Sequence, residues 1–249
     1  MALSVNMMVP LLGVLKSGMR VASLGYPDII SPMEILKGLG PDVSGLRFRK
    51  DSEAICRRHG LKNRAIPDAH SLFNSLGCEL DVYDIAQERG CEIICDLNAD
   101  WGKDGLASVN YGAYEMNFYE GGYDIVLDVG TVEHCFNIAQ AVVNMAGMVK
   151  EGGYIFHENP FNLPNHGFYN LNPTWYADFY SANGFKLLEC KIVTRDGRSA
   201  EVPHTVKFIA DAGEVTIFAM AQRTVRQPFV YPCQSKYKKL MKAVPAAGD

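Results

Sequence analysis

The sequence lacks paired cysteines, a strong charge bias and a long apolar segment, and each absence argues against a class of protein. Its seven cysteines, at positions 56, 78, 91, 95, 135, 190 and 233, are odd in number and include no C-x-x-C pair. This pattern favours reduced thiols in a cytoplasmic protein over a disulfide framework or a cysteine-rich zinc cluster. The formal net charge of −4 gives no electrostatic reason to expect nucleic acid as a partner.

The N-terminal apolar run, residues 5–14, is too short to cross a bilayer and has no basic leader or small-residue cleavage site. We therefore expect a packing helix there and no membrane partner. A chain of 249 residues with 48% apolar composition suits one large α/β domain over residues 1–249.

Glycine is scarce where a nucleotide-binding sheet needs it most. Residues 19–24 are typical of a first strand that turns at Gly25, but Tyr26, Pro27 and Asp28 follow. Glycines after a first strand let the backbone approach a bound cofactor. The sequence therefore predicts a first turn with only one of the usual glycines.

The clearest strand and helix signals lie in the middle of the chain. Residues 123–129 form a β-branched apolar run typical of a buried parallel strand. A helical pattern over 138–149, a turn at Gly152-Gly153 and a strand at 153–157 complete a crossover unit. Further strands are predicted at 78–84, 91–96, 185–193 and 215–220, with the last two following a helix at 172–184.

These elements predict a doubly wound, mostly parallel seven-stranded sheet with helices on both faces. The long connection at about 38–77 contains two helix-like pieces and is interpreted as a helical insertion after the first strand. Ligands bind at the carboxyl ends of the strands in such sheets. Two loops, at about 101–120 and 157–172, are expected on the acceptor side of that edge.

In the order of its strands and in the stretch 123–156, the chain resembles the class I S-adenosylmethionine-dependent methyltransferases, with a degenerate glycine-rich first motif. The resemblance covers most of the chain and implies S-adenosylmethionine as cofactor. Residue by residue, it implies that the cofactor is held by Gly25 at the first turn, Asp84 on the ribose hydroxyls, Asp96 and Leu97 at the adenine, and Asp128 at the rim of the active site. A carboxylate suits vicinal hydroxyls because it accepts two charge-assisted hydrogen bonds. The alternative is that Asp84 and Asp96 are ordinary strand-ending or helix-capping acids, a reading that fits Asp96 better than Asp84. Asp51, which is nearer to Gly25 in the sequence, is the rival of Asp84 for the ribose.

His134 is the leading candidate for catalysis. A neutral imidazole takes a proton from an acceptor hydroxyl near physiological pH, and Glu133 or Asp128 could orient it. The resemblance supports a role for the Glu133-His134 pair, and His166 is assigned to the acceptor. A histidine at the start of a helix is also often only a capping or packing residue.

Residues 157–169 combine histidine, asparagine and aromatic side chains, a composition that suits a sugar. The alternative is a loop whose polar side chains bond their own backbone. His157, Glu158 and His166 give a weak signal for a divalent metal ion, but without recognised ligand spacing no metal ligands are assigned.

The function expected is methyl transfer to an oxygen of a small-molecule or glycan acceptor, such as a sugar or a natural product. One alternative is a catalytically degenerate, methyltransferase-like binding or regulatory subunit, which the eroded first turn would explain. An NAD-type oxidoreductase ranks last because it too needs a glycine-rich first turn. The sequence leaves homo-oligomerisation open.

Overall fold

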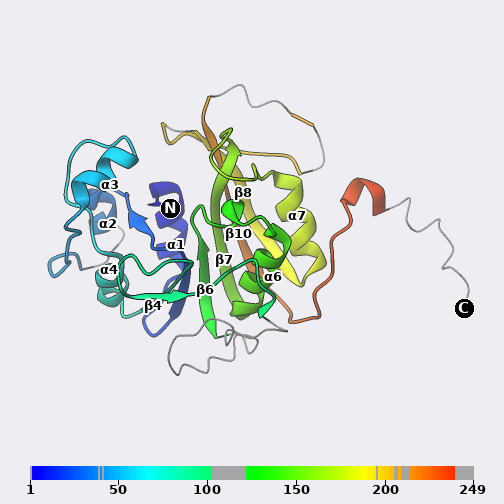
Figure 1. Ribbon diagram of the computed structural model, residues 1–249, viewed down its shortest axis with the longest axis horizontal. Helices are drawn as coiled ribbons and strands as arrows, with labels where there is room; N and C mark the ends of the chain where they lie inside the picture. The colour runs from blue at the N-terminus through cyan, green and yellow to red at the C-terminus, as the bar shows by residue number, and fades with distance from the viewer. Residues whose placement is uncertain are drawn as a thin grey trace, which may run out of the picture.

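The computed structural model describes residues 2–38, 40, 42–101, 122–194, 196–204, 207–208 and 213–238. Its centre is an eight-stranded sheet with the strand order β5-β4-β2-β6-β7-β10-β8-β9 (Figure 1). Its strands are β2 Arg20–Leu24, β4 Glu79–Asp84, β5 Glu92–Ile94, β6 Tyr123–Asp128, β7 Val149–Asn162, β8 Phe185–Thr194, β9 Ser199–Glu201 and β10 Val215–Arg223.

The five strands from β5 to β7 run parallel, and β10 is antiparallel to both β7 and β8. The predicted doubly wound, mostly parallel sheet with helices on both faces is thereby confirmed. The expected count of seven strands is exceeded by β9, which pairs antiparallel with β8 at the edge of the sheet. A strand of three exposed residues has no apolar alternation by which the sequence could indicate it.

Helices cover both faces of the sheet. The described α-helices of three or more residues are α1 Val5–Val14, α2 Met33–Gly38, α3 Ser52–Arg58, α4 Ala69–Ser75, α6 Ile138–Met148 and α7 Pro173–Ala182. Helices α1 and α4 share one apolar core with Val21, while α6 and α7 share the other with Ala22 and Leu24. Successive side chains of a strand point to opposite faces, so β2 contributes to both cores. The central strands are thus buried on both sides.

The connection after β2 differs from a simple insertion. It begins with β3, Asp28–Ile29, which pairs parallel with β1, Ala2–Leu3, in a separate two-stranded sheet. Helix α4 lies inside the expected insertion at 38–77, yet it packs in the apolar core with β4. Its N-cap Asp68 accepts a hydrogen bond from Ser71 N at 2.9 Å. Helix α4 is therefore the helix of the crossover between β2 and β4.

Strand β7 is much longer than the 153–157 predicted. It pairs with β10 from Tyr154 to Asn162, opposite Gln222 to Val215. A polar run follows the predicted strand in the sequence. This run also belongs to the sheet, because it pairs with β10. The first part of the expected loop at 157–172 is therefore strand, and the expected loop at 101–120 lies, apart from Trp101, outside the described residues.

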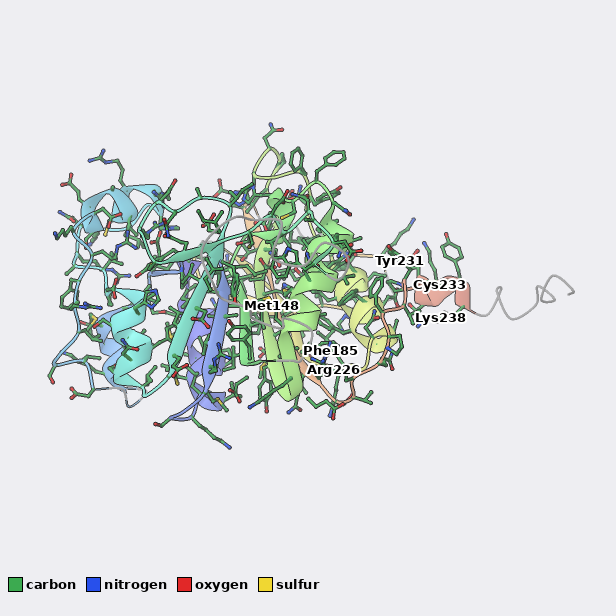
Figure 2. The ribbon with its side chains drawn as sticks, turned by 60° about the horizontal axis from the view of Figure 1, so that its bottom comes forward. Met148, Phe185, Arg226, Tyr231, Cys233 and Lys238 are labelled. Carbon is green, nitrogen blue, oxygen red and sulfur yellow. The ribbon has the colours of Figure 1, made fainter. Side chains whose placement is uncertain are left out.

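The C-terminal segment runs along α7. Val230 N donates to Asn183 Oδ1 at 2.8 Å, and Ser235 N donates to Asp178 Oδ2 at 3.0 Å. Figure 2 shows Tyr231 and Lys238 at the end of the molecule, beyond Phe185. This segment lies on the side of α7 and not at the carboxyl ends of the parallel strands.

Candidate functional site

Two of the predicted acids lie at the carboxyl ends of β4 and β5. Asp84 ends β4, and its carbonyl oxygen accepts a hydrogen bond from Cys95 N at 2.8 Å, which holds the two strand ends together. Asp96 follows at once and is exposed. Ile85 follows Asp84 directly and is 73% exposed. An exposed aliphatic side chain next to a carboxylate suits a nucleoside, which has an apolar base face and polar hydroxyls.

The first turn contains the single glycine that the sequence indicates. Gly25 has a φ of +80°, and its N–H donates to Tyr83 O at 2.6 Å. Thr131 Oγ1 donates to Leu24 O, and Ser23 Oγ donates to Gly25 O at 2.7 Å. The carbonyls of the turn are therefore bonded within the protein.

Beyond this turn the chain enters β3 and not a helix. The Tyr26 ring is buried, and the guanidinium carbons of Arg49 and Arg89 lie 4.9 and 4.7 Å from its centre. Its hydroxyl donates to Asp68 Oδ2 at 2.6 Å. A glycine-rich cradle at a helix N-terminus is thus replaced by an aromatic ring with two cations.

Asp128 lies at the end of β6 and organises the turn that follows. Its Oδ1 accepts hydrogen bonds from Thr131 N at 3.0 Å and Val132 N at 3.2 Å. Its Oδ2 faces His157 Nδ1 at 2.7 Å and accepts from Asn159 Nδ2 at 2.9 Å. Because the side chain is fully buried, contact with a cofactor would require this network to open. Asp128 therefore acts on the site indirectly, by holding the turn after β6 and the side chains of His157 and Asn159 in place.

Two tyrosines of α7 complete the buried network. Tyr176 donates to Asn159 Oδ1 at 2.7 Å, and the Tyr180 hydroxyl bonds His157 Nε2. Burial raises the pKa of both tyrosines, so both hydroxyls remain protonated. Both ring nitrogens of His157 have protein partners, which corrects the suggestion that His157 belongs to a metal site.

Glu133 lies in the short 3-10 helix η3, Val132–His134, directly above this network. Its Oε2 accepts a hydrogen bond from Asn159 Nδ2 at 3.0 Å. Its Oε1 is buried, has no hydrogen-bond partner among the described residues, and lies 3.9 Å from His134 Nε2 and 3.5 Å from His166 Nε2. The neighbouring Glu133 carboxylate raises the pKa of His166. The structure thus brings together the three residues predicted for catalysis.

Two loops with the same spacing meet around Glu133. His134 and Phe136 come from the segment after β6, and His166 and Phe168 from the segment after β7. The histidine ring centres lie 5.2 Å apart, and the phenylalanine rings meet edge to face at 5.5 Å. The two phenylalanines are 73% and 63% exposed. Together these rings offer polar edges and an apolar surface at one rim.

Backbone contact fixes the second loop against the first. Phe168 N donates to the Glu133 carbonyl oxygen at 2.9 Å. A Cβ at Gly167 would lie only 2.9 Å from the same oxygen, so the close approach needs glycine. The position of His166 is therefore set by the backbone of Glu133.

A cavity of about 480 Å³ opens beside this cluster and is lined by Ser4, Gly130, Glu133, Glu158, Asn159 and His166, among others. Ser4 Oγ donates to Glu158 Oε2 at 2.7 Å, and burial raises the pKa of Glu158. Asp84 and Asp96 are not among the residues that line this cavity. The cavity is large enough for a small polar molecule.

Sequence reasoning missed Asn159, Tyr176 and Tyr180 as site-organising residues, and Phe136 and Phe168 as exposed rings. The polar run at 157–159 signals only that something at the end of β7 is polar. The tyrosines look like the apolar face of an ordinary helix. Among the described residues, no helix has the length and apolarity needed to cross a membrane.

Comparison with known proteins finds no matching family model and no matching curated protein. Among solved structures, the chain is similar to the Burkholderia thailandensis 1,6-didemethyltoxoflavin-N1-methyltransferase with bound 1,6-didemethyltoxoflavin and S-adenosylhomocysteine, at 12% identity and a TM-score of 0.46 over 88% of this chain and 76% of that one. It is also similar to the [4+2]-cyclase SpnF, at 12% identity and a TM-score of 0.45 over 88% and 80%. The CurJ carbon methyltransferase is similar at 12% identity and a TM-score of 0.44, over 88% of this chain and 53% of that one. These likenesses concern the fold alone.

Proposed function

We propose that this chain is an S-adenosylmethionine-dependent methyltransferase that acts on an oxygen of a small polar acceptor, such as a sugar, a glycan or a natural product. The proposal is carried by the convergence of His134 and His166 on the buried Glu133, at the sheet edge where Asp84 and Asp96 also lie. Parallel sheets of this kind bind ligands at that edge.

The nucleoside end of the cofactor fits the residues present. Asp84 would accept hydrogen bonds from the ribose hydroxyls, and Asp96 with Leu97 would meet the adenine edge. Ile85, 73% exposed, would cover one face of the base. Burying such a side chain against a ligand contributes about 1 to 2 kcal/mol. The methionine end would pass Gly25, which itself has no side chain.

When bound, S-adenosylmethionine supplies a methyl group that its sulfonium already makes electrophilic. The protein's part is alignment of the acceptor oxygen, exclusion of water and removal of the acceptor's proton. His134 or His166, oriented by Glu133, would take that proton. The negative Glu133 stabilises the imidazolium formed, as the raised pKa of His166 illustrates.

A sugar-like acceptor fits the rim. The exposed rings of Phe136 and Phe168 would cover the apolar face of a sugar, and the imidazoles would meet its hydroxyls. The cavity beside His166 gives room for a further polar group near Glu158.

One observation favours the alternative of a binding or regulatory subunit without activity. The first turn leads into β3, and its Leu24 carbonyl is already bonded to Thr131. Because these contacts close the turn, they would leave less space for the methionine part of the cofactor. The two functions differ in whether S-adenosylmethionine binds.

The test is calorimetric titration of the purified full chain with S-adenosylmethionine and S-adenosylhomocysteine, with NAD as control ligand. Asp84→Ala removes the proposed ribose contact. Glu79→Ala is the matched control, because it removes a carboxylate from the opposite end of the same strand. Micromolar binding that is lost only in Asp84→Ala supports the proposal. A folded protein that binds neither sulfur ligand refutes it and leaves the subunit alternative.

A further inference from the structure

Three side chains with metal-binding atoms meet at the rim of the cavity. One oxygen of Glu133 and one ring nitrogen each of His134 and His166 all lie within 4.8 Å of one another. Glu133 has no exposed side-chain surface, while His134 and His166 are 48% and 47% exposed. A fixed acid and two more exposed imidazoles therefore share one point in space.

The separations suit a single ion. A divalent ion with bonds of about 2.0 to 2.2 Å to nitrogen and oxygen holds its donors about 3 to 3.5 Å apart. Glu133 Oε1 is 3.5 Å from His166 Nε2 and 3.9 Å from His134 Nε2. The remaining separations, which reach at most 4.8 Å, would close by rotation of the two half-exposed imidazoles, while the buried acid stays in place.

We propose that Glu133, His134 and His166 bind a divalent transition-metal ion. The buried, unpartnered Oε1 of Glu133 is the second observation in its favour. A carboxylate oxygen removed from water without a partner is costly, and a bound cation would remove that cost.

The surroundings of Glu133 hold it as a metal ligand is usually held. Its other oxygen accepts from Asn159, which is fixed in turn by Asp128 and by Tyr176. Such outer hydrogen bonds orient a ligating carboxylate and keep its free oxygen directed at the ion. The network therefore presents Oε1, and not Oε2, to the two histidines.

The donor set selects the class of ion. Two imidazoles and one carboxylate suit Zn²⁺, Co²⁺ or Fe²⁺, whereas Ca²⁺ takes six to eight oxygen ligands and Mg²⁺ an octahedron of mostly oxygen and water. Three protein ligands leave coordination positions open, as in catalytic sites. On the strength of the proposed function, an acceptor hydroxyl would occupy an open position, where the ion orients and polarises it. With the ion bound, His134 and His166 would be its ligands, and the proton of the polarised hydroxyl would pass to water; in the metal-free protein, one of the two imidazoles would take it as proposed above.

The experiment uses the full chain after dialysis against a chelator. Zn²⁺ is titrated by calorimetry, and Co²⁺ is added separately to record its visible absorption. We expect one strong site per chain and a visible spectrum typical of a Co²⁺ ion with a low coordination number. His134→Ala and His166→Ala should each lose the strong site and the spectrum. His204→Ala, a histidine outside the cluster, is the matched control and should keep both.

Glu133→Gln tests the third ligand, and circular dichroism checks that each variant is folded. The two histidine variants keep the test decisive if the buried Glu133 variant does not fold. The proposal is overturned if the folded wild type takes up no zinc, or if both histidine variants bind zinc as tightly as the wild type does, for example through exposed Cys91. Titration with S-adenosylmethionine is a separate measurement, so failure of metal binding and failure of the proposed function are distinguished.

Discussion

The side-chain amide of Asn159 holds Glu133 by one carboxylate oxygen only, with Nδ2 3.0 Å from Oε2. The same amide nitrogen lies 2.9 Å from Asp128 Oδ2. One asparagine thus joins the acid that ends β6 to the acid of η3, and it leaves Glu133 Oε1 to face His134 and His166. The arrangement of the site depends on this shared donor.

A protein in which Asn159 is replaced should be less stable to unfolding than the wild type. Asn159→Ala leaves two buried carboxylate oxygens and the Tyr176 hydroxyl without this partner, a loss of about 3 kcal/mol in the free energy of unfolding. Urea denaturation measures the loss. The control is Asn162→Ala on the same strand, whose amide makes one long exposed contact of 3.4 Å. Equal stability of the two variants would contradict the role given to Asn159.

Gly167 should tolerate no side chain. The added Cβ of Gly167→Ala would lie 2.9 Å from the Glu133 carbonyl oxygen, so the loop must shift, at a cost of about 1 to 3 kcal/mol. Thermal unfolding measures that cost, and the histidine signals in NMR spectra report the movement of His166. Gly213→Ala, where nothing lies within 4 Å of the new atom, is the control. Unchanged stability and histidine signals in Gly167→Ala would show that the two loops do not touch as described.

Glu158 gives the protein a predictable dependence on pH. Burial raises the pKa of Glu158, so the folded state prefers its protonated form. Its contribution to stability is therefore full below the ordinary glutamate pKa and is lost as the pH rises through the raised value. Glu158→Gln, which keeps an oxygen for Ser4, should be more stable than the wild type at pH 7.5 and equally stable near pH 4.

Denaturation of both proteins at the two pH values measures that difference, and groups that titrate in both proteins cancel. Glu151→Gln replaces an exposed acid near the start of β7, the strand that also contains Glu158, and should show no such dependence on pH. A stability difference that is the same at both pH values would contradict the burial of Glu158 as its cause.

Ile85 should contribute to cofactor binding and little to folding. Ile85→Ser removes apolar area at the proposed adenine site and should weaken S-adenosylmethionine binding roughly tenfold, with stability nearly unchanged because the side chain is 73% exposed. Calorimetry gives the affinity. Leu188→Ser, an exposed aliphatic on β8, should bind as the wild type does. Unaltered affinity in Ile85→Ser would show that the adenine of the cofactor does not bind at the end of β4.

The local pattern of the chain was enough to predict most elements. The apolar run of β6, the helical spacing of α6 and the alternation in β4 each depend on neighbours in sequence, so their types follow from periodicity. The Glu133-His134 pair could be singled out because it follows a strand that the crossover places at the ligand edge. The far end of β7 could not be predicted, since its pairing partner β10 lies more than 50 residues away.

The sequence by itself determined a doubly wound sheet, the edge at which a ligand would bind, and a first turn poor in glycine. Only the tertiary structure decided which side chains meet there: that His166 joins Glu133 across 33 positions, that Asn159 divides its amide between two acids, and that His157 is committed to Asp128 and Tyr180. The physical reason is that periodicity and turn residues are set by near neighbours, whereas these contacts arise from sheet register and from the return of a loop to the Glu133 backbone.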